Sequence, residues 1–227
     1  MCIVPSRAQS FKLKGAPDAG IAGICLMVDV LLTTDHRVKQ ARPVFPWGYE
    51  MTEQAIGSFE SMGLAAPLLK AIETLGFTQA TPVQAEAVPA AMKGGDWMVS
   101  SQTGSGKTAA FLLPVLHKIM MSNGGKNSPM DLQRFVGPAA LVLCPTRELA
   151  QQVAQDAIDL LKNSKGVRVA TVTGGMPYGK QMASLRGALV VVATPGRLLD
   201  LAQRRQIHLA DVKTLVVDEA DRMLDLG

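Results

Sequence analysis

Residues 97–108 read WMVSSQTGSGKT and place a glycine-rich turn between two segments of different periodicity. The apolar run before the turn is typical of a buried strand, and residues 107–121 after it have helical spacing. The glycines let backbone N–H groups turn inward, where they can bind phosphate together with the helix N-terminus. Lys107 supplies a cation for the β and γ phosphates, and the Thr108 hydroxyl can bind Mg²⁺. This stretch therefore predicts a nucleotide phosphate-binding loop.

The loop departs from the strict pattern G-x-x-x-x-G-K-[ST] at its first position, where this chain has Ser101. The alternative interpretation is an ordinary Gly/Ser turn before a helix, and the strand–turn–helix context argues against it. We expect the nucleotide to contact the whole loop, which consists of Ser101, Gln102, Thr103, Gly104, Ser105, Gly106, Lys107 and Thr108.

A second motif, Asp218-Glu219-Ala220-Asp221, follows the apolar run 215–217. A carboxylate at the end of a buried strand can hold Mg²⁺, usually through water, and its neighbour can then polarise the attacking water. Alone, these four residues could equally be a solvated helix start that suits the helix dipole. Together with the phosphate-binding loop, they favour a nucleotide hydrolysis site.

Strand-like and helical runs alternate through most of the chain, which predicts an α/β fold with a doubly wound, mostly parallel sheet and helices on both faces. The strand-like runs are residues 96–101, 139–144, 167–173, 188–193 and 214–217, and the helical runs are 64–75, a segment from Pro82, 107–121, 147–161, 178–186 and 196–204. Ligands of such sheets bind at the carboxyl ends of the strands. Both motifs follow strands, so we expect them at one edge of the sheet.

Composition bounds the class of protein. The chain has 227 residues, of which 48% are apolar and 19% charged, so it can bury a sizeable core. The net charge of +4 permits an acidic partner such as nucleic acid. Three cysteines without a CxxC pair exclude a disulfide framework and favour a reduced, cytoplasmic location. No apolar run reaches the roughly 18 residues of a membrane span, so no membrane association is expected.

Residues 1–55 lack the periodicity of the rest and form an unassigned N-terminal tail in this interpretation, with one domain over 56–227. Pro43, Pro46 and Gly48 make a turn-rich stretch near the proposed boundary. The apolar run 19–32, which Asp29 interrupts, could be an isolated helix or strand or part of the tail.

Six motifs in order resemble those of the DEAD-box RNA helicases, over about residues 59–227. They are GFTQATPVQ at 76–84 with Phe59 upstream (the Q motif), the phosphate-binding loop, PTRELA at 145–150, the glycine pair at 174–175, TPGR at 194–197, and DEAD at 218–221. The resemblance identifies the chain as the N-terminal RecA-like P-loop domain of such an enzyme. It implies ATP hydrolysis coupled to RNA unwinding or remodelling.

The resemblance also implies roles around the nucleotide. ATP and Mg²⁺ are the expected cofactors, with Thr108 and Asp218 at the metal and Glu219, Lys107 and Asp218 as catalytic residues. Gln84 would read adenine, since a carboxamide can pair with N6 and N7 together, and Phe59 and Phe77 would line or support the adenine pocket. Asp221 would couple the nucleotide site to the rest of the enzyme.

On the nucleic-acid side the resemblance implies contacts to the RNA backbone with little sequence preference. The expected RNA-binding residues are Pro145, Thr146, Arg147, Gly174, Gly175, Thr194, Pro195, Gly196 and Arg197. Thr146 and Thr194 are plausible N-caps, and the helices that they begin would present free N–H groups to phosphates. Arg147 and Arg197 oppose the helix dipole in those first turns, and an anion between these arginines and the helix ends would explain their presence.

The chain stops at Gly227, before the Ser-Ala-Thr motif and the second RecA-like domain of the family. The second domain is therefore an expected partner, and we expect the chain alone to be nearly inactive as an ATP hydrolase. Two alternatives are a non-catalytic ATP- and RNA-binding fragment and a DNA-directed helicase. RNA-stimulated phosphate release would test the first, and competition between RNA and DNA would test the second.

Overall fold

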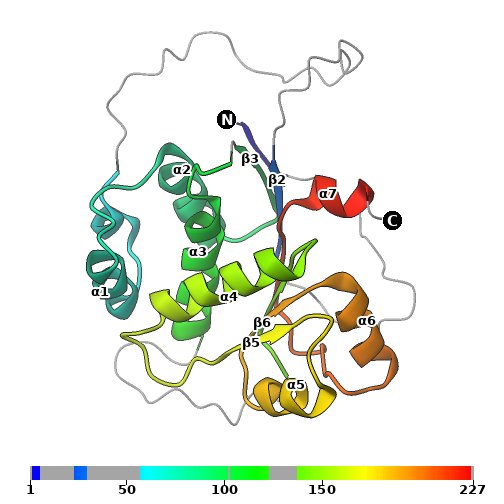
Figure 1. Cartoon of the computed structure of the whole chain (residues 1–227). Coiled ribbons are helices and arrows are strands. Elements are labelled where there is room, and N and C mark those ends of the chain that lie inside the picture. The colour runs from blue at the N-terminus through cyan, green and yellow to red at the C-terminus, as the bar shows by residue number, and fades with distance from the viewer. Residues whose placement is uncertain (1, 6–22, 30–56, 102, 123–136, 226–227) are drawn as a thin grey trace, which may run out of the picture.

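The computed structural model describes residues 2–5, 23–29, 57–101, 103–122 and 137–225. Within these ranges the chain forms a seven-stranded sheet covered by helices (Figure 1). The strands are β1 (Cys2–Pro5), β2 (Gly23–Asp29), β3 (Trp97–Ser101), β4 (Ala140–Leu143), β5 (Val169–Val172), β6 (Val190–Ala193) and β7 (Thr214–Val217). Their order is β1-β3-β2-β7-β4-β6-β5, with β1 antiparallel to β3 and all other pairs parallel.

Among the described residues, three helices lie between β2 and β3 in the chain, four more each connect one strand to the next, and the last helix follows β7. They are the 3-10 helix η1 (Phe59–Met62), α1 (Ala66–Thr74), α2 (Pro82–Met92), α3 (Lys107–Met121), α4 (Arg147–Leu160), α5 (Tyr178–Leu185), α6 (Pro195–Gln203) and α7 (Ala220–Asp225). Each predicted helix and each of the five predicted strands is present, with bounds that differ by at most a few residues. The predicted α/β fold with a mostly parallel sheet is confirmed.

Successive side chains of a strand point to opposite faces of the sheet, so neighbouring residues of one strand pack in different hydrophobic clusters. In β4, Ala140 and Val142 pack in a cluster with α1–α4, whereas Leu141 packs in a second cluster with Leu198 and Leu201 of α6. Figure 1 shows the same division, with α3 and α4 on the side of the sheet away from α6. The sheet is therefore doubly wound, and its strand ends form an edge between two helical layers.

The interpretation of residues 1–55 as a tail outside the domain is wrong for the two segments that the structure describes there. Strand β2 lies between β3 and β7, where Cys25 is opposite Trp97 on one side and Val216 on the other. A strand with parallel partners on both sides typically has a continuous apolar sequence, and ICLMV at 24–28 fits that rule. The remainder of residues 1–55, including the turn-rich stretch near Pro46, lies outside the described residues.

Candidate nucleotide and nucleic-acid site

The predicted phosphate-binding loop joins the end of β3 to the start of α3. Gly104 and Gly106 have φ angles of +78° and +90°, which favour glycine because other residues are strained there. The Ser101 and Ser105 hydroxyl oxygens are 2.8 Å apart, and Lys107 Nζ donates to the Ser101 carbonyl at 3.0 Å. The lysine amine thus contacts its own loop in the structure. Gln102 lies outside the described residues.

The predicted acidic motif follows β7, in the same cavity as the loop. Asp218 is 4% exposed and accepts a hydrogen bond from the Glu219 backbone N–H at 3.1 Å. Burial, reinforced by the negative charge of Glu219, raises the pKa of Asp218 to about 6, although Lys107 opposes the shift. Burial also lowers the pKa of the Lys107 amine, and Asp218 partly offsets this. Burial therefore destabilises the charged forms of Asp218 and Lys107. A bound Mg²⁺ would stabilise the carboxylate, and a bound phosphate would stabilise the ammonium group.

Glu219 has a left-handed backbone, with φ of +49°, which turns the chain sharply as it leaves β7. Its carboxylate accepts a hydrogen bond from Arg222 at 2.6 Å. One carboxyl oxygen of Asp221 is buried and has no partner among the described residues. Asp221 does not line the cavity, so its position is consistent with a role away from the metal.

Gln84 lies beside the phosphate-binding loop, and both ends of its amide already have partners. Its Oε1 accepts from the Thr81 backbone N–H at 3.0 Å, completing a capping box at the start of α2, and its Nε2 donates to the Gly106 carbonyl at 3.1 Å. Adenine recognition would use the remaining lone pair and N–H, or would replace these bonds. Sequence reasoning did not anticipate this link between α2 and the loop.

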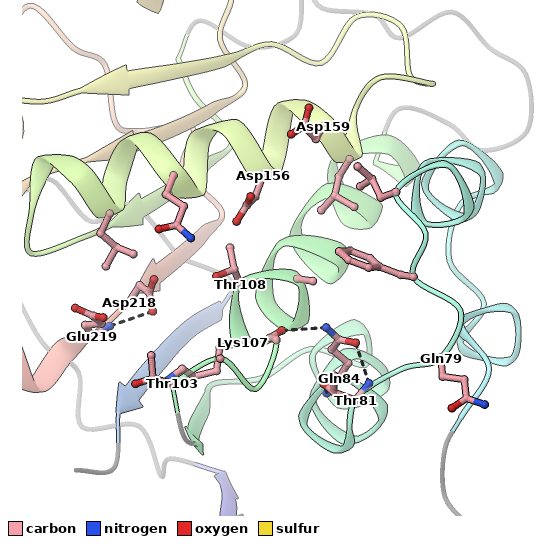
Figure 2. Close-up of a pocket in the computed structure, with 18 residues that line it drawn as sticks. Gln79, Thr81, Gln84, Thr103, Lys107, Thr108, Asp156, Asp159, Asp218 and Glu219 are labelled. Carbon is pink, nitrogen blue, oxygen red and sulfur yellow. Dashed lines mark hydrogen bonds between the residues drawn. The ribbon is translucent and has the colours of Figure 1, made fainter.

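These elements line a cavity of about 530 Å³, a size typical of small-molecule sites. Figure 2 shows the residues that line it. The predicted residues in its lining are Phe77, Gln84, Thr103, Gly104, Gly106, Lys107, Thr108, Asp218 and Glu219. Ser101, Ser105 and Phe59 do not line it. Phe59 is instead buried in the core, whereas Phe77 is 44% exposed. Of the two phenylalanines, only Phe77 is placed to touch a ligand.

The cavity also has a wall that sequence reasoning missed. Residues of α4 line it, including Leu149, Gln152, Asp156, Asp159 and Leu160. Asp156 points toward Thr108 in Figure 2, and burial together with the charge of Asp159 raises its pKa. The spacing of these positions along one face of the predicted helix could have indicated a shared surface, but only the packing of α4 beside α3 turns that face to the cavity.

The residues expected to contact RNA follow β4, β5 and β6, at the same edge of the sheet. Thr146 caps α4 by accepting from the Leu149 N–H at 3.2 Å, as predicted. Thr194 occupies the N-cap position of α6 with an extended backbone, as predicted, but its side chain makes no capping hydrogen bond. Gly175 is exposed with φ of +80°, and the Arg147 guanidinium occupies the space that a side chain at Gly175 would need. PTRELA and the glycine pair are therefore in direct contact.

Arg197 is less available to an anion than the sequence suggested. Its side chain is 15% exposed, and Nη1 donates to Gln181 Oε1 at 3.0 Å and to the Met176 carbonyl at 3.3 Å. Its guanidinium also lies 4.5 Å from the centre of the Tyr178 ring. The sequence analysis did not predict a role for Gln181 or Tyr178. The signal was present for Gln181, because it lies one turn before Leu185 on the inward stripe of the predicted helix.

Comparison with known proteins identifies the family. The DEAD/DEAH box helicase family matches residues 81–227. The ATP-dependent RNA helicase RhlB of Pseudomonas syringae pv. tomato is 45% identical over 172 residues, covering 74% of this chain and 42% of that protein. The ATP-dependent RNA helicase DeaD of Escherichia coli K12 is 44% identical over 171 residues, covering 75% of this chain and 25% of that protein.

A solved structure agrees with these sequence matches. The crystal structure of a DEAD box protein from the hyperthermophile Methanococcus jannaschii superimposes with a TM-score of 0.63 at 34% identity, over 75% of this chain and 43% of that one. The chain spans less than half the length of each of these three relatives. Among the residues that the structure describes, no helix is both long and apolar enough to cross a membrane. Since the family match extends over well more than half of its residues, the chain belongs to the DEAD/DEAH box helicase family.

Proposed function

We propose that this chain is the first RecA-like domain of an ATP-dependent RNA helicase, and that it binds Mg²⁺·ATP on one part of the sheet edge and an RNA backbone on the other. The observation that carries the proposal is the single cavity that brings the phosphate-binding loop, Gln84 and the Asp218–Glu219 pair together. That combination supports hydrolysis of a nucleoside triphosphate, and the Q motif favours adenine.

The donor set is suited to Mg²⁺ held largely through water. Thr108 offers a hydroxyl, and Asp218 offers a buried carboxylate whose raised pKa indicates that it lacks a sufficient counter-charge. No cluster of three or more His, Cys, Asp or Glu is present among the described residues, and Mg²⁺ does not need one because it retains several waters. Bound Mg²⁺ would neutralise charge on the phosphates during their transfer.

Each protein group has a distinct task in this proposal. Lys107 would exchange its bond to the Ser101 carbonyl for one to the β or γ phosphate. Glu219 would orient the attacking water after its bond to Arg222 loosens or shifts. In the whole protein, a second RecA-like domain would complete the site, because closure is what assembles such sites and excludes water.

Nucleotide titration of the 227-residue chain tests the proposal. We expect a fluorescent ATP analogue to bind in the presence of Mg²⁺, ATP to displace it better than GTP, and Lys107→Ala to abolish binding without lowering the melting temperature. Lys93→Ala, a change at an exposed lysine after α2, is the matched control and should bind normally. Equal displacement by ATP and GTP would contradict adenine recognition, and normal binding by Lys107→Ala would contradict the phosphate site.

RNA dependence is tested on the whole protein. Single-stranded RNA should stimulate phosphate release, and Glu219→Gln should retain ATP binding but lose that release, because it removes the carboxylate while keeping its shape. Stronger stimulation by DNA than by RNA would favour a DNA-directed helicase. Nucleotide and RNA binding without any turnover would favour a non-catalytic module.

A further inference from the structure

The side-chain amide of Gln181 is fully buried and joins two of the expected RNA-binding motifs, the glycine pair and TPGR. It is 0% exposed. Its Nε2 donates to the Thr173 carbonyl at 2.9 Å, directly before the glycine pair, and its Oε1 accepts from Arg197 of TPGR at 3.0 Å. A buried amide with both ends satisfied is a rigid link, because breaking either bond leaves a polar group without water.

Arg197 extends this link to the other side of the glycine pair. The Nη1 that donates to Gln181 also donates to the Met176 carbonyl at 3.3 Å. Thr173 and Met176 flank Gly174 and Gly175, so the two carbonyls hold the turn from both ends. Stacking on Tyr178 and a 4.0 Å approach to Asp200 fix the guanidinium further.

We propose that Gln181 is a positioning residue for RNA, and that it acts through Arg197. The pair fixes the position of the glycine turn relative to the first turn of α6. The backbone N–H groups of these two turns can then bind consecutive phosphates of an RNA strand, and the turns do not have to become ordered when the RNA binds. Arg197 thus serves mainly as a structural clasp and contributes little as a direct phosphate ligand. The inference rests on the proposed RNA-binding function of this edge.

Preorganisation has a measurable size here. Two loops that lose a charge-assisted hydrogen bond must be ordered when RNA binds, and such a bond typically corresponds to about a tenfold change in an equilibrium constant. Loss of a direct phosphate contact would, in addition, make the plot of log K against log salt less steep, because each contact contributes about −0.7 to that slope for a single strand. A lost clasp lowers affinity and leaves that slope unchanged, since the number of phosphate contacts stays the same.

The test measures binding of a labelled single-stranded RNA by the 227-residue chain over a series of salt concentrations. Gln181→Met keeps the length of the side chain and removes both polar ends, and Gln181→Glu keeps an acceptor for Arg197 but loses the donor to Thr173. Arg204→Gln is the matched control: Arg204 also lies over Tyr178 and binds Asp200, but no hydrogen bond joins it to the glycine turn. ATP-analogue affinity reports whether each variant is folded.

We expect Gln181→Met to weaken RNA binding about tenfold with an unchanged salt slope and normal ATP-analogue affinity, and Arg204→Gln to have a much smaller effect. Gln181→Met combined with Arg197→Met should be no weaker than Arg197→Met alone, because both changes open the same clasp. Normal RNA affinity of folded Gln181→Met, additive effects in the double variant, or a reduced salt slope for Arg197→Met would each overturn the inference.

Hydrogen exchange supplies a measurement that does not depend on RNA. The Gly174–Met176 amides should exchange faster in both Gln181 variants than in the wild type and in Arg204→Gln, and equal rates would overturn the clasp. If the wild type binds ATP but no RNA, the RNA part of the proposed function fails and the positioning role falls with it. If the wild type binds RNA and Gln181→Glu matches it in affinity and exchange, the proposed function stands and this inference alone is refuted.

Discussion

Asp218→Asn is expected to stabilise the nucleotide-free domain while removing the carboxylate that we propose as a metal ligand. The carboxyl of Asp218 is nearly inaccessible, and its pKa rises from 3.8 to about 6 because of burial and the neighbouring Glu219. The folded state therefore binds this proton more tightly than the unfolded state does. Stability from this group is complete below pH 3.8 and is lost as the pH rises through about 6, a total cost of about 3 kcal/mol at neutral pH.

Asparagine removes the charge and keeps an oxygen that can accept the Glu219 N–H. In metal-free buffer with a chelator, we expect the variant to be more stable than the wild type at pH 7.5 by up to about 3 kcal/mol, a figure that already includes the attraction between Asp218 and Lys107. The difference between the two proteins should widen by about 1.4 kcal/mol from pH 5 to pH 7.5, which is roughly half of the full effect.

Urea unfolding at pH 5 and pH 7.5 measures this difference. Burial lowers the pKa of His117, whose Nδ1 accepts a hydrogen bond from the Ala65 N–H at 3.1 Å. The contribution of His117 to the folding stability of the protein therefore falls as the pH drops below the ordinary histidine pKa of 6.5. That opposite trend is common to both proteins and cancels in their difference. Glu86→Gln, at an exposed carboxylate on α2, is the control. A stability difference that does not change with pH would refute the reasoning.

Three further outcomes follow from particular contacts. Gly106→Ala would place a methyl group 2.5 Å from Gln84 Nε2 at a φ of +90°, so we expect urea unfolding to show a loss of more than about 1 kcal/mol together with weaker ATP binding; Gly94→Ala, with φ of +93° and open space, should show the backbone cost alone. Removal of residues 1–56 takes β2 from between β3 and β7, and we expect calorimetry to show a lower melting temperature, whereas an unchanged one would mean that β2 is not integral. Thr81→Ala should cost about 1 kcal/mol in urea unfolding by removing the capping box, and Thr81→Ser should restore most of it.

Local sequence determined most of the secondary structure and the kind of chemistry. The helix that begins at Lys107 has the predicted bounds, because its periodicity and the glycine turn before it are properties of neighbouring residues. The strands β4 and β6 could be recognised for the same reason, as short apolar runs that a parallel sheet covers on both faces. The loop, the acidic motif and their order in the chain were sufficient to predict a nucleotide site at one edge of the sheet.

Tertiary structure alone decided which side chains meet. The bonds from Gln84 to Gly106 and from Gln181 to Arg197 join residues 22 and 16 positions apart, and each depends on how two separate helices pack. The place of β2 in the sheet likewise depends on partners far along the chain, since an isolated apolar run carries no record of its neighbours. Motifs name the groups that can do the chemistry, and long-range packing determines which of those groups remain free to do it and which are held by one another.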